Sequence, residues 1–285
     1  MSSETNIEQY SYGLNKTYKP YKVLEKVSTN DIKSTNLTDT FSLIIPAYNE
    51  EKRIQPFLEQ IVSELPVNWE IIIVIDGNDR TGEIARSFGN RFKIYEYKHK
   101  LGKGGAIIEG FKRSTGSIIG YADADGAVSP HEIKRIFNYV TEGPDVAIGS
   151  RWVRGAMLET KQPLPRVLLG RLYHYFTFVF LGIKVKDTQC GVKAMRSDVV
   201  DRILGKITVN NLSFDTALLY HCKKNSFRVA EIPIKWQDVQ GSKVHIIKTS
   251  FIMFLSIVGI RMAHSRNFYS FKRIVENIRK LIENA

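Results

Sequence analysis

The sequence predicts an α/β fold, a mostly parallel β-sheet with helices on both of its faces. The first observation is a series of short apolar runs, such as Phe41–Pro46, which are typical of strands buried in a parallel sheet. The second is the helical spacing of the apolar residues between these runs, as in Glu50–Leu65. The third is their alternation, because strands that alternate with helices of this length form right-handed βαβ units.

The predicted elements follow one another between residues 41 and 122. After the buried strand Phe41–Pro46, the segment Glu50–Leu65 is a helix because its apolar residues recur on one face. A second buried strand, Trp69–Ile75, ends at the turn-forming residues that begin with Asp76. The chain then continues with a helix at Thr81–Phe88, a strand at Phe92–Tyr97, a helix at Gly104–Arg113 and a strand at Ser117–Ala122.

The two ends of the chain differ from its middle. Residues 1–38 are polar and lack periodicity, so we expect a loosely structured N-terminal extension. We expect one globular domain over residues 39–240. Residues 241–285 are basic, and the apolar stripe of Phe268–Leu281 predicts a tail of amphipathic helices. The basic residues of this tail form either a solvated face or a surface for anionic lipid headgroups, and we favour the lipid surface.

The apolar segments of the chain are short. None reaches the roughly 20 residues that a membrane-spanning helix needs, and the N-terminus has no apolar signal core. The two cysteines make no disulfide framework, which indicates a reducing environment. We therefore expect a cytoplasmic protein that binds peripherally at the cytoplasmic face of a membrane. The two most apolar segments, Leu168–Ile183 and Ser250–Ile260, are either core helices or interfacial helices.

The formal net charge of the chain is +12, which favours an anionic partner. A nucleic acid, an acidic membrane surface and a phosphorylated ligand all fit this charge. A nucleic-acid-binding module is the least favoured of these classes, because acidic residues gather at the ends of the predicted strands and would repel a phosphate backbone. The chain also lacks the sequence patterns of such modules.

A pair of carboxylates follows the predicted strand Ser117–Ala122. Ligands of open α/β sheets bind at the carboxyl ends of the strands, and Asp123 and Asp125 stand at such an end. Two carboxylates in this arrangement can hold Mg²⁺ or Mn²⁺, which take oxygen ligands and share them with substrate phosphates. A turn with solvated carboxylates is the alternative interpretation.

A glycine-rich turn at Leu101–Ala106 carries Lys103 and leads into a predicted helix. Backbone amides, the helix dipole and an ammonium group together suit a diphosphate. The spacing is neither that of a Walker loop nor that of a dinucleotide-binding fingerprint. A surface turn without a ligand is the alternative.

Taken together, these motifs resemble those of family 2 glycosyltransferases. The resemblance covers about residues 40–262 and is strongest to the branch of dolichyl-phosphate β-glucosyltransferases and the related mannosyltransferases. The motifs that carry it are, in order, IPAYNEE (Ile45–Glu51), IDG (Ile75–Gly77), GKGGA (Gly102–Ala106), DADG (Asp123–Gly126), GSR (Gly149–Arg151), DTQCGVK (Asp187–Lys193), SFDTALLY (Ser213–Tyr220) and IPIKWQDVQGSKV (Ile232–Val244).

The resemblance implies a GT-A fold and an inverting hexosyltransferase that depends on Mg²⁺ or Mn²⁺. The implied reaction transfers a hexose, with UDP-glucose as the first choice of donor, to dolichyl or polyprenyl phosphate and gives a β-linked product. UDP-N-acetylglucosamine and GDP-mannose remain as alternative donors. A sugar or protein hydroxyl remains as an alternative acceptor, and it would need Asp215 as a general base.

The resemblance also assigns residues to the donor site. Asp123 and Asp125 would hold the metal against both phosphates, Lys103 would neutralise the diphosphate, and Asp76 would lie at the edge of the uracil. The other residues implied in nucleotide binding are Pro46, Ala47, Tyr48, Glu50 and Ala124.

On the acceptor side, Arg151 and Arg166 lie where the family places cations for the lipid phosphate. Gln189 and Lys193 belong to the loop that closes over donor and acceptor, and Asp215 lies near the sugar. The residues implied in catalysis are Asp125, Asp215 and Gln189, and those implied in binding the acceptor phosphate are Arg151, Arg166 and Lys193.

The chain departs from the family pattern at a few positions. Ala217 stands where the family usually has an acidic residue, which bears on sugar recognition or on the partner of Asp215. Gln240 is neutral where a carboxylate is common in the family. Ala127 replaces a polar residue of the mannosyltransferase branch and fits the glucosyl-type branch better. Gly170 precedes Arg171 where the mannosyl-type sequences usually have serine, so we expect the acceptor site to differ in detail.

Overall fold

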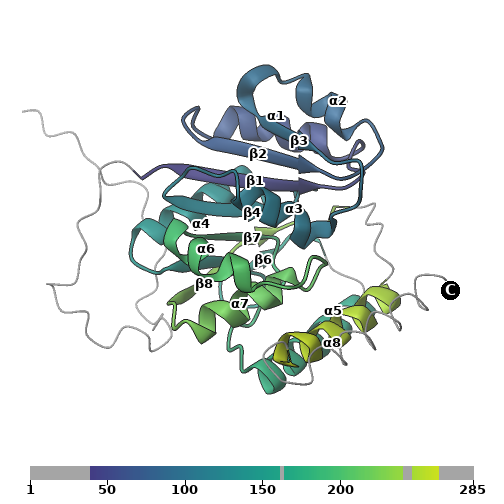
Figure 1. Ribbon diagram of the computed structural model, residues 1–285, viewed down its shortest axis with the longest axis vertical. Helices are drawn as coiled ribbons and strands as arrows, with labels where there is room; N and C mark the ends of the chain where they lie inside the picture. The colour runs from purple at the N-terminus through teal and green to yellow at the C-terminus, as the bar shows by residue number, and fades with distance from the viewer. Residues whose placement is uncertain (1–38, 161–163, 240–245, 263–285) are drawn as a thin grey trace, which may run out of the picture. The chain divides into compact units, whose positions relative to one another are not determined.

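The computed structural model describes residues 39–160, 164–239 and 246–262 (Figure 1). The predicted N-terminal extension and the predicted helix Phe268–Leu281 lie outside these residues. The described part is an α/β fold with a mostly parallel sheet, so the predicted fold class is confirmed.

The main sheet has seven strands in the order β3-β2-β1-β4-β7-β5-β8. Every neighbouring pair is parallel except the two pairs that β7 makes, because β7 runs antiparallel to β4 and to β5. The strands are β1 Phe41–Ala47, β2 Glu70–Ile75, β3 Lys93–Glu96, β4 Ile118–Ala122, β5 Val146–Ser150, β7 Val192–Arg196 and β8 Val229–Pro233, and β6 Met157–Leu158 pairs with β9 Lys235–Trp236 in a small second sheet.

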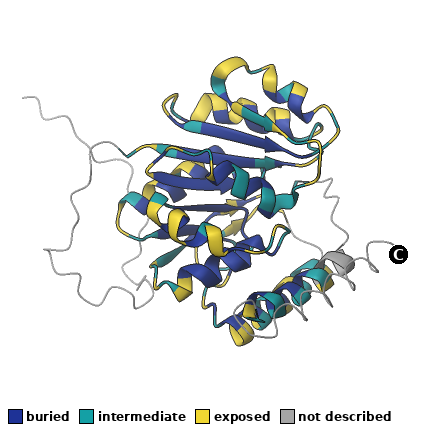
Figure 2. Ribbon diagram, in the orientation of Figure 1, coloured by how far each residue is buried: buried dark blue, intermediate teal, exposed yellow. Residues whose placement is uncertain are grey.

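Helices cover both faces of the main sheet, which explains why its strands are continuous apolar runs. In β1, Leu43 and Ile45 belong to one core cluster and Ile44 belongs to the other, and all three side chains are fully buried. Figure 2 shows the central strands of the sheet mostly in the colour of buried residues. Alternate residues of a strand face opposite sides, so a strand covered on both sides needs apolar residues at every position. The sequence pattern therefore already encoded the two layers of helices.

The two helical layers contribute different parts of the core. The first layer holds α1 Ile54–Glu64, α2 Thr81–Arg86 and α4 Pro130–Thr141. Ser129 caps α4 by accepting a hydrogen bond from the backbone N–H of Glu132, and a proline occupies the first turn. The second layer holds α3 Gly102–Phe111, α6 Ser197–Ile203 and α7 Phe214–Lys224. Helices α5 Leu164–Phe176 and α8 Ile246–Met262 contribute to the same core cluster, and the hydroxyl groups of Tyr173 in α5 and Thr216 in α7 form a hydrogen bond.

Most element boundaries differ little from those predicted. The helix predicted from Glu50 begins only at Ile54, because Glu50–Arg53 forms a turn in which the N–H of Arg53 donates to the carbonyl of Glu50. The helix predicted from Gly104 begins two residues earlier, at Gly102, whose φ of 75° favours glycine.

The segment Leu168–Ile183 is helical, as α5 and a π-helical continuation at Thr177–Leu181. α5 contacts α8, and the ring of Phe176 packs edge-on against the ring of Phe254. Within the described residues, no helix combines the length and the hydropathy that crossing a bilayer requires.

Candidate active site

One edge of the main sheet collects the chemically interesting residues. The parallel strands β1, β2, β4, β5 and β8 all end there, and the antiparallel strand β7 begins there. The loops that follow β4 and β5 and the loop that precedes β7 therefore meet at this edge. The segment after β9 reaches the same place, since the N–H of Gln237 donates to the carbonyl of Ala127.

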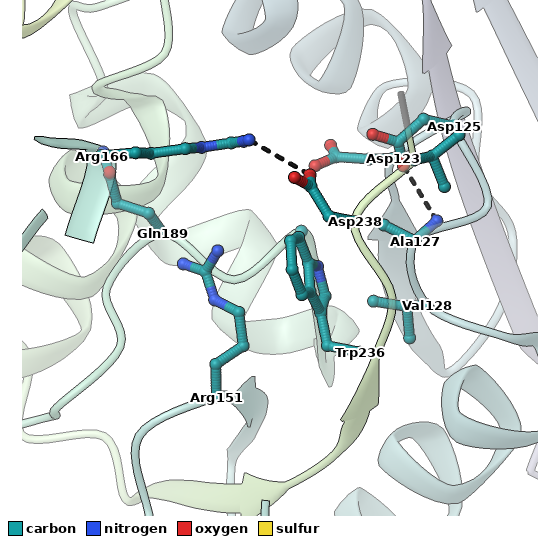
Figure 3. Close-up of a pocket in the computed structure, with 11 residues that line it drawn as sticks. Asp123, Asp125, Ala127, Val128, Arg151, Arg166, Gln189, Trp236 and Asp238 are labelled. Atoms are coloured by element: carbon teal, nitrogen blue, oxygen red, sulfur yellow. Dashed lines mark hydrogen bonds and ion pairs between the residues drawn. The ribbon is translucent and has the colours of Figure 1, made fainter. Parts of the chain in front are cut away.

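A cavity of about 110 Å³ lies among these loops (Figure 3). Sites that enclose a drug-sized ligand usually measure roughly 300–1,000 Å³, so this cavity is too small to enclose a whole ligand of that size. The predicted residues in its wall are Asp123, Asp125, Arg151, Arg166 and Gln189, and the other lining residues are Ala127, Val128, Gly191, Trp236, Asp238 and Val239.

Asp123 and Asp125 present carboxylates to this cavity. Their side chains are 37% and 29% exposed, which leaves oxygen atoms accessible. Asp125 Oδ1 accepts a hydrogen bond from the N–H of Ala127 at 3.0 Å, so the turn orients this carboxylate. A Cβ atom at Gly191 would lie 2.3 Å from Asp123 Oδ2, and only glycine leaves room for this carboxylate. Two exposed hard oxygen donors beside a cavity fit a divalent cation that takes its remaining ligands from phosphate and water.

No group of three or more histidine, cysteine or acidic side chains in the described ranges could hold a metal ion. Asp123 and Asp125 are the candidate ligands among the described residues, and the third aspartate of the cavity, Asp238, pairs with Arg166. Two carboxylates suit Mg²⁺ or Mn²⁺ better than a structural zinc site, which takes four protein ligands.

Lys103 joins the carboxylates from the first turn of α3. Its Nζ lies 2.7 Å from Asp123 Oδ1 and 3.3 Å from Asp215 Oδ2, and the side chain is 13% exposed. Burial lowers the pKa of Lys103, but the charges of the two aspartates outweigh burial and raise it above its ordinary value. Lys103 therefore keeps its positive charge beside Asp123 and Asp215.

Asp76 holds the turn that delivers Lys103. Its side chain is buried, and Oδ2 accepts hydrogen bonds from the backbone N–H groups of Leu101 and Gly102 at 2.7 and 2.8 Å. A carboxylate that caps the start of a helix in this way also interacts favourably with the helix dipole. The place at the edge of the uracil that the resemblance implies for Asp76 stays a prediction.

Asp215 lies beneath the cavity rather than in its wall. It is 2% exposed and accepts hydrogen bonds from Lys193 and from the hydroxyl of Tyr121, both at 2.5 Å. Burial raises the pKa of Asp215, but the charges of Lys103 and Lys193 outweigh it and hold the pKa below its ordinary value. A buried carboxylate with a lowered pKa is a weak base, so this geometry does not suit the alternative role of Asp215 as a general base.

The prediction that Lys193 binds the acceptor phosphate does not fit its position. The side chain is fully buried, and its ammonium group donates to Asp215 and, at 2.8 Å, to the carbonyl of Cys190. Strand β7 alternates its side chains across the sheet, and this register turns Lys193 into the core. Lys193 neutralises Asp215 there instead of facing the cavity.

Arg151 reaches the wall of the cavity, but its charge is paired. The guanidinium donates to both carboxylate oxygens of Asp187, at 2.7 and 2.9 Å, and the N–H of Arg151 donates to the same carboxylate. Burial raises the pKa of Asp187, but the charge of Arg151 outweighs it and lowers the pKa. Asp187 also accepts from the N–H of Gln189 at 3.2 Å, so it positions the loop before β7.

Arg166 and Asp238 face each other at the wall of the cavity (Figure 3). Arg166 comes from the first turn of α5, and its guanidinium lies 3.2 Å from Asp238 Oδ1. The side chain of Arg166 is 38% exposed, so this ion pair is accessible to solvent and exchangeable. Gln189 lines the same cavity, and its side-chain nitrogen Nε2 donates to the sulfur of Met253 in α8 at 3.8 Å.

The residues predicted to bind the base and ribose lie at the ends of β1 and β4. Tyr48 presents an exposed ring with the Lys100 ammonium 4.2 Å from its centroid. Glu50 forms a two-pronged ion pair with Arg53, at 2.7 and 2.8 Å. Ala47 and Ala124 are buried and Pro46 is partly buried, so these three shape the backbone at this edge.

Sequence reasoning missed four residues of this site. Asp187 and Asp238 lie within quoted motifs, but their partners are distant in sequence and no local pattern reveals them. Trp236 lines the cavity and stacks under Arg151, whose guanidinium lies 5.5 Å from the centre of its ring. Arg53 approaches Asp125 to 3.9 Å and thereby connects Glu50 with the metal carboxylates.

The comparisons with known proteins agree with this arrangement. The model of the family described as glycosyl transferase family 2 matches residues 42–204. The chain is 32% identical over 256 residues to the dolichyl-phosphate beta-glucosyltransferase of Saccharomyces cerevisiae, which covers 80% of this chain and 76% of that protein. It is 30% identical over 228 residues to the human protein of the same name, which covers 73% of this chain and 70% of that protein.

Solved structures with a similar fold include the glucosyl-3-phosphoglycerate synthase of Mycobacterium tuberculosis. Its complex with uridine diphosphate superposes with a TM-score of 0.62 at 15% identity and covers 83% of both chains. Its complex with Mn²⁺, UDP-glucose and phosphoglyceric acid gives a TM-score of 0.62 at 14% identity over 82% of both chains. At this identity the likeness shows a shared fold.

Proposed function

Because the chain belongs to glycosyl transferase family 2, we propose that it transfers glucose from UDP-glucose to dolichyl or polyprenyl phosphate. Its GT-A fold is confirmed by the sheet and by its structural neighbours. The observation that carries the proposal is the similarity, at about 30% identity over most of the chain, to dolichyl-phosphate glucosyltransferases from several organisms. The cavity supports it, since Asp123, Asp125 and Arg166 line the cavity and Lys103 contacts Asp123.

The donor side follows from the charges at the sheet edge. Asp123 and Asp125 would hold Mg²⁺ or Mn²⁺, which when bound supplies positive charge to the departing nucleoside diphosphate. Lys103 adds a fixed positive charge on the same side. Tyr48 and Glu50 would contact the base and ribose.

The acceptor side needs orientation rather than proton transfer. The oxygen of a lipid monophosphate is already anionic at neutral pH, so it can attack C1 of glucose without a general base. Arg166 would align this phosphate, because its guanidinium lines the cavity and its partner Asp238 is solvent-accessible. The bond from the phosphate oxygen to C1 forms as the bond from C1 to the diphosphate oxygen breaks, and the α-linked donor gives a β-linked product.

We also propose peripheral contact with an anionic membrane, through α5 and its continuation. The exposed apolar residues Leu164, Leu168, Leu172, Tyr175 and Val179 recur at intervals of three and four, which places them on one face of the helix. Here this set is called the α5 stripe. Because Arg166 lies on the same helix, a membrane against the α5 stripe would bring a lipid phosphate close to the cavity.

The test offers labelled UDP-glucose, UDP-N-acetylglucosamine and GDP-mannose to the purified protein with Mn²⁺ or Mg²⁺ and a short polyprenyl phosphate. We expect label to enter the organic phase from UDP-glucose only, and only with the metal. Transfer from another donor would replace the proposed sugar. Transfer to a hydroxyl acceptor, with none to the lipid phosphate, would contradict the proposed acceptor.

A further inference from the structure

The ammonium group of Lys103 contacts Asp123, one of the two carboxylates that would hold a metal ion. Its Nζ lies 2.7 Å from Asp123 Oδ1, the distance of a strong charged hydrogen bond. The other oxygen of Asp123 is backed by Gly191, where even a Cβ atom would come within 2.3 Å. A cation that approaches Asp123 from the cavity therefore meets an oxygen that Lys103 already holds.

The charges around Lys103 are nearly balanced without a metal. Asp123, Asp125 and Asp215 carry three negative charges, and Lys103 and Lys193 carry two positive ones, which leaves one negative charge. The charge of Arg53, which lies 3.9 Å from Asp125, is balanced by its own ion pair with Glu50. A divalent ion alone would turn this into one positive charge and would stand beside the poorly exposed ammonium of Lys103. Adding a diphosphate with two negative charges restores the original balance.

Asp215 gives Lys103 a second partner that stays in place. It accepts hydrogen bonds from Lys193 and Tyr121, and all three side chains are buried. The distance of 3.3 Å to Lys103 is longer than the distance between Lys103 and Asp123. The ammonium group of Lys103, at the start of α3, can therefore leave Asp123 and keep its ion pair with Asp215.

We propose that the ammonium group of Lys103 stays on the carboxylate of Asp123 until the donor binds and then moves to the diphosphate. The carboxylate then becomes available to the divalent ion, so the ion and the diphosphate bind together. Asp215 is a positioning residue in this scheme, because it acts on the diphosphate only through Lys103. The proposal rests on the proposed function, since it takes a nucleoside diphosphate as the ligand of this edge. It adds that the metal and the nucleotide each depend on the other for binding, and such coupling is reciprocal.

The test measures Mn²⁺ binding by the electron paramagnetic resonance signal of free Mn²⁺, with and without UDP. For the unaltered protein, we expect UDP to tighten Mn²⁺ binding on the order of tenfold or more. For Lys103→Met, we expect tighter Mn²⁺ binding than in the unaltered protein when UDP is absent, and a much smaller effect of UDP. Lys112→Met is the matched control, because Lys112 lies at the other end of α3, is 54% exposed and pairs with Glu109.

Two results would overturn the inference. One is Mn²⁺ binding by the unaltered protein that is equally tight with and without UDP. The other is Lys103→Met with unchanged or weaker Mn²⁺ binding in the absence of UDP. If Lys103→Met does not fold, Lys103→Arg replaces it: this variant keeps the charge, so it should keep the weak binding of Mn²⁺ alone, and tight binding would contradict the scheme. Calorimetry with UDP separates the two proposals, because failure to bind UDP at all would instead remove the proposed function.

Discussion

At the scale of single residues, the site contains charges with two kinds of surroundings. Lys193 and Arg151 are each locked to a buried aspartate, Asp215 and Asp187 respectively. A buried pair of this kind is costly to break, because the remaining charge has no partner. The charges of Asp125 and Arg166 are accessible from the cavity. Substitutions of these accessible residues should therefore change activity more than stability.

Asp125→Asn should abolish measurable transfer, a loss on the order of a hundredfold or more. The amide keeps the side-chain oxygen that accepts from Ala127 but removes the charge that a divalent ion needs, so the melting temperature should change little. Turnover is measured at saturating Mn²⁺ alongside thermal unfolding. Asp198→Asn, at an exposed residue of α6, is the matched control. A turnover that equals that of the unaltered protein would refute the assignment of Asp125 to the metal.

Arg151→Met should lower the free energy of unfolding by about 3–5 kcal/mol, because it leaves the buried Asp187 without its cation. The double variant Arg151→Met, Asp187→Asn should lose less than the sum of the two single losses. Urea unfolding of the four proteins measures this coupling. Additive losses would show that the pair does not stabilise the fold.

The same ion pair predicts a dependence of stability on pH. The pKa of Asp187 is lowered in the folded state, so its contribution is present above its ordinary pKa of about 4 and is lost as the pH falls through the lowered value. In Arg151→Met, burial without the cation should raise this pKa, and protonation should then restore stability as the pH falls. Urea unfolding between neutral and acidic pH measures both proteins. Parallel curves would contradict the role of Asp187.

At the scale of elements, the direction of β7 decides which residues reach the cavity. Because β7 is antiparallel to β4 and β5, its first residue lies at the edge where those strands end. The preceding loop brings Gln189 and Gly191 to the carboxylates. A parallel strand in the same position would present its last residues there instead. Helix α5 also places a residue at the cavity, because its first turn supplies Arg166. The α5 stripe runs along this helix and its π-helical continuation.

The α5 stripe should contribute to membrane binding without contributing to nucleotide binding. Leu168→Gln combined with Leu172→Gln should weaken binding to vesicles of phosphatidylcholine and phosphatidylserine several-fold, because it removes apolar area from an exposed helix face. Vesicle sedimentation measures this, and calorimetry with UDP checks that the donor site is intact. Val67→Gln is the control, as Val67 is an exposed apolar residue outside α5. Unchanged vesicle binding would mean that something other than a membrane covers the stripe.

At the scale of the whole molecule, the positive charge is unevenly distributed. The chain has a net charge of +12, but the wall of the cavity contains three aspartates, Asp123, Asp125 and Asp238, and only two arginines. The excess of positive charge therefore lies elsewhere on the chain. Such an excess attracts anionic surfaces over about one Debye length.

Binding to anionic vesicles should therefore weaken with salt. Raising NaCl from about 0.1 M to about 1 M shortens the Debye length from roughly 10 Å to 3 Å and should remove most of the binding that depends on phosphatidylserine. Vesicle sedimentation at both salt concentrations measures it, with vesicles of phosphatidylcholine alone as the control. Binding that resists salt on both kinds of vesicle would show that the net charge is not used for membrane contact.

Much of the fold could be predicted because it depends on local patterns. Strands β1, β2 and β4 are continuous apolar runs, and their ends carry Asp76 and Asp123, so the sequence located the edge of the sheet that holds the site. The family resemblance, which the comparisons confirm, added the class of reaction. Strand β7 was not predicted, since neither its direction nor its place between β4 and β5 is a local property.

The sequence by itself determined the α/β class, the buried strands, the carboxylates at their ends and the glycine turn with its lysine. Only the tertiary structure decided which charges face the cavity. It turned Lys193 inward to Asp215 and paired Arg151 with Asp187 and Arg166 with Asp238. The last two pairs join residues 36 and 72 positions apart. The partner of a charged side chain is set by which distant segments pack together, and a pattern of neighbouring residues carries no record of that packing.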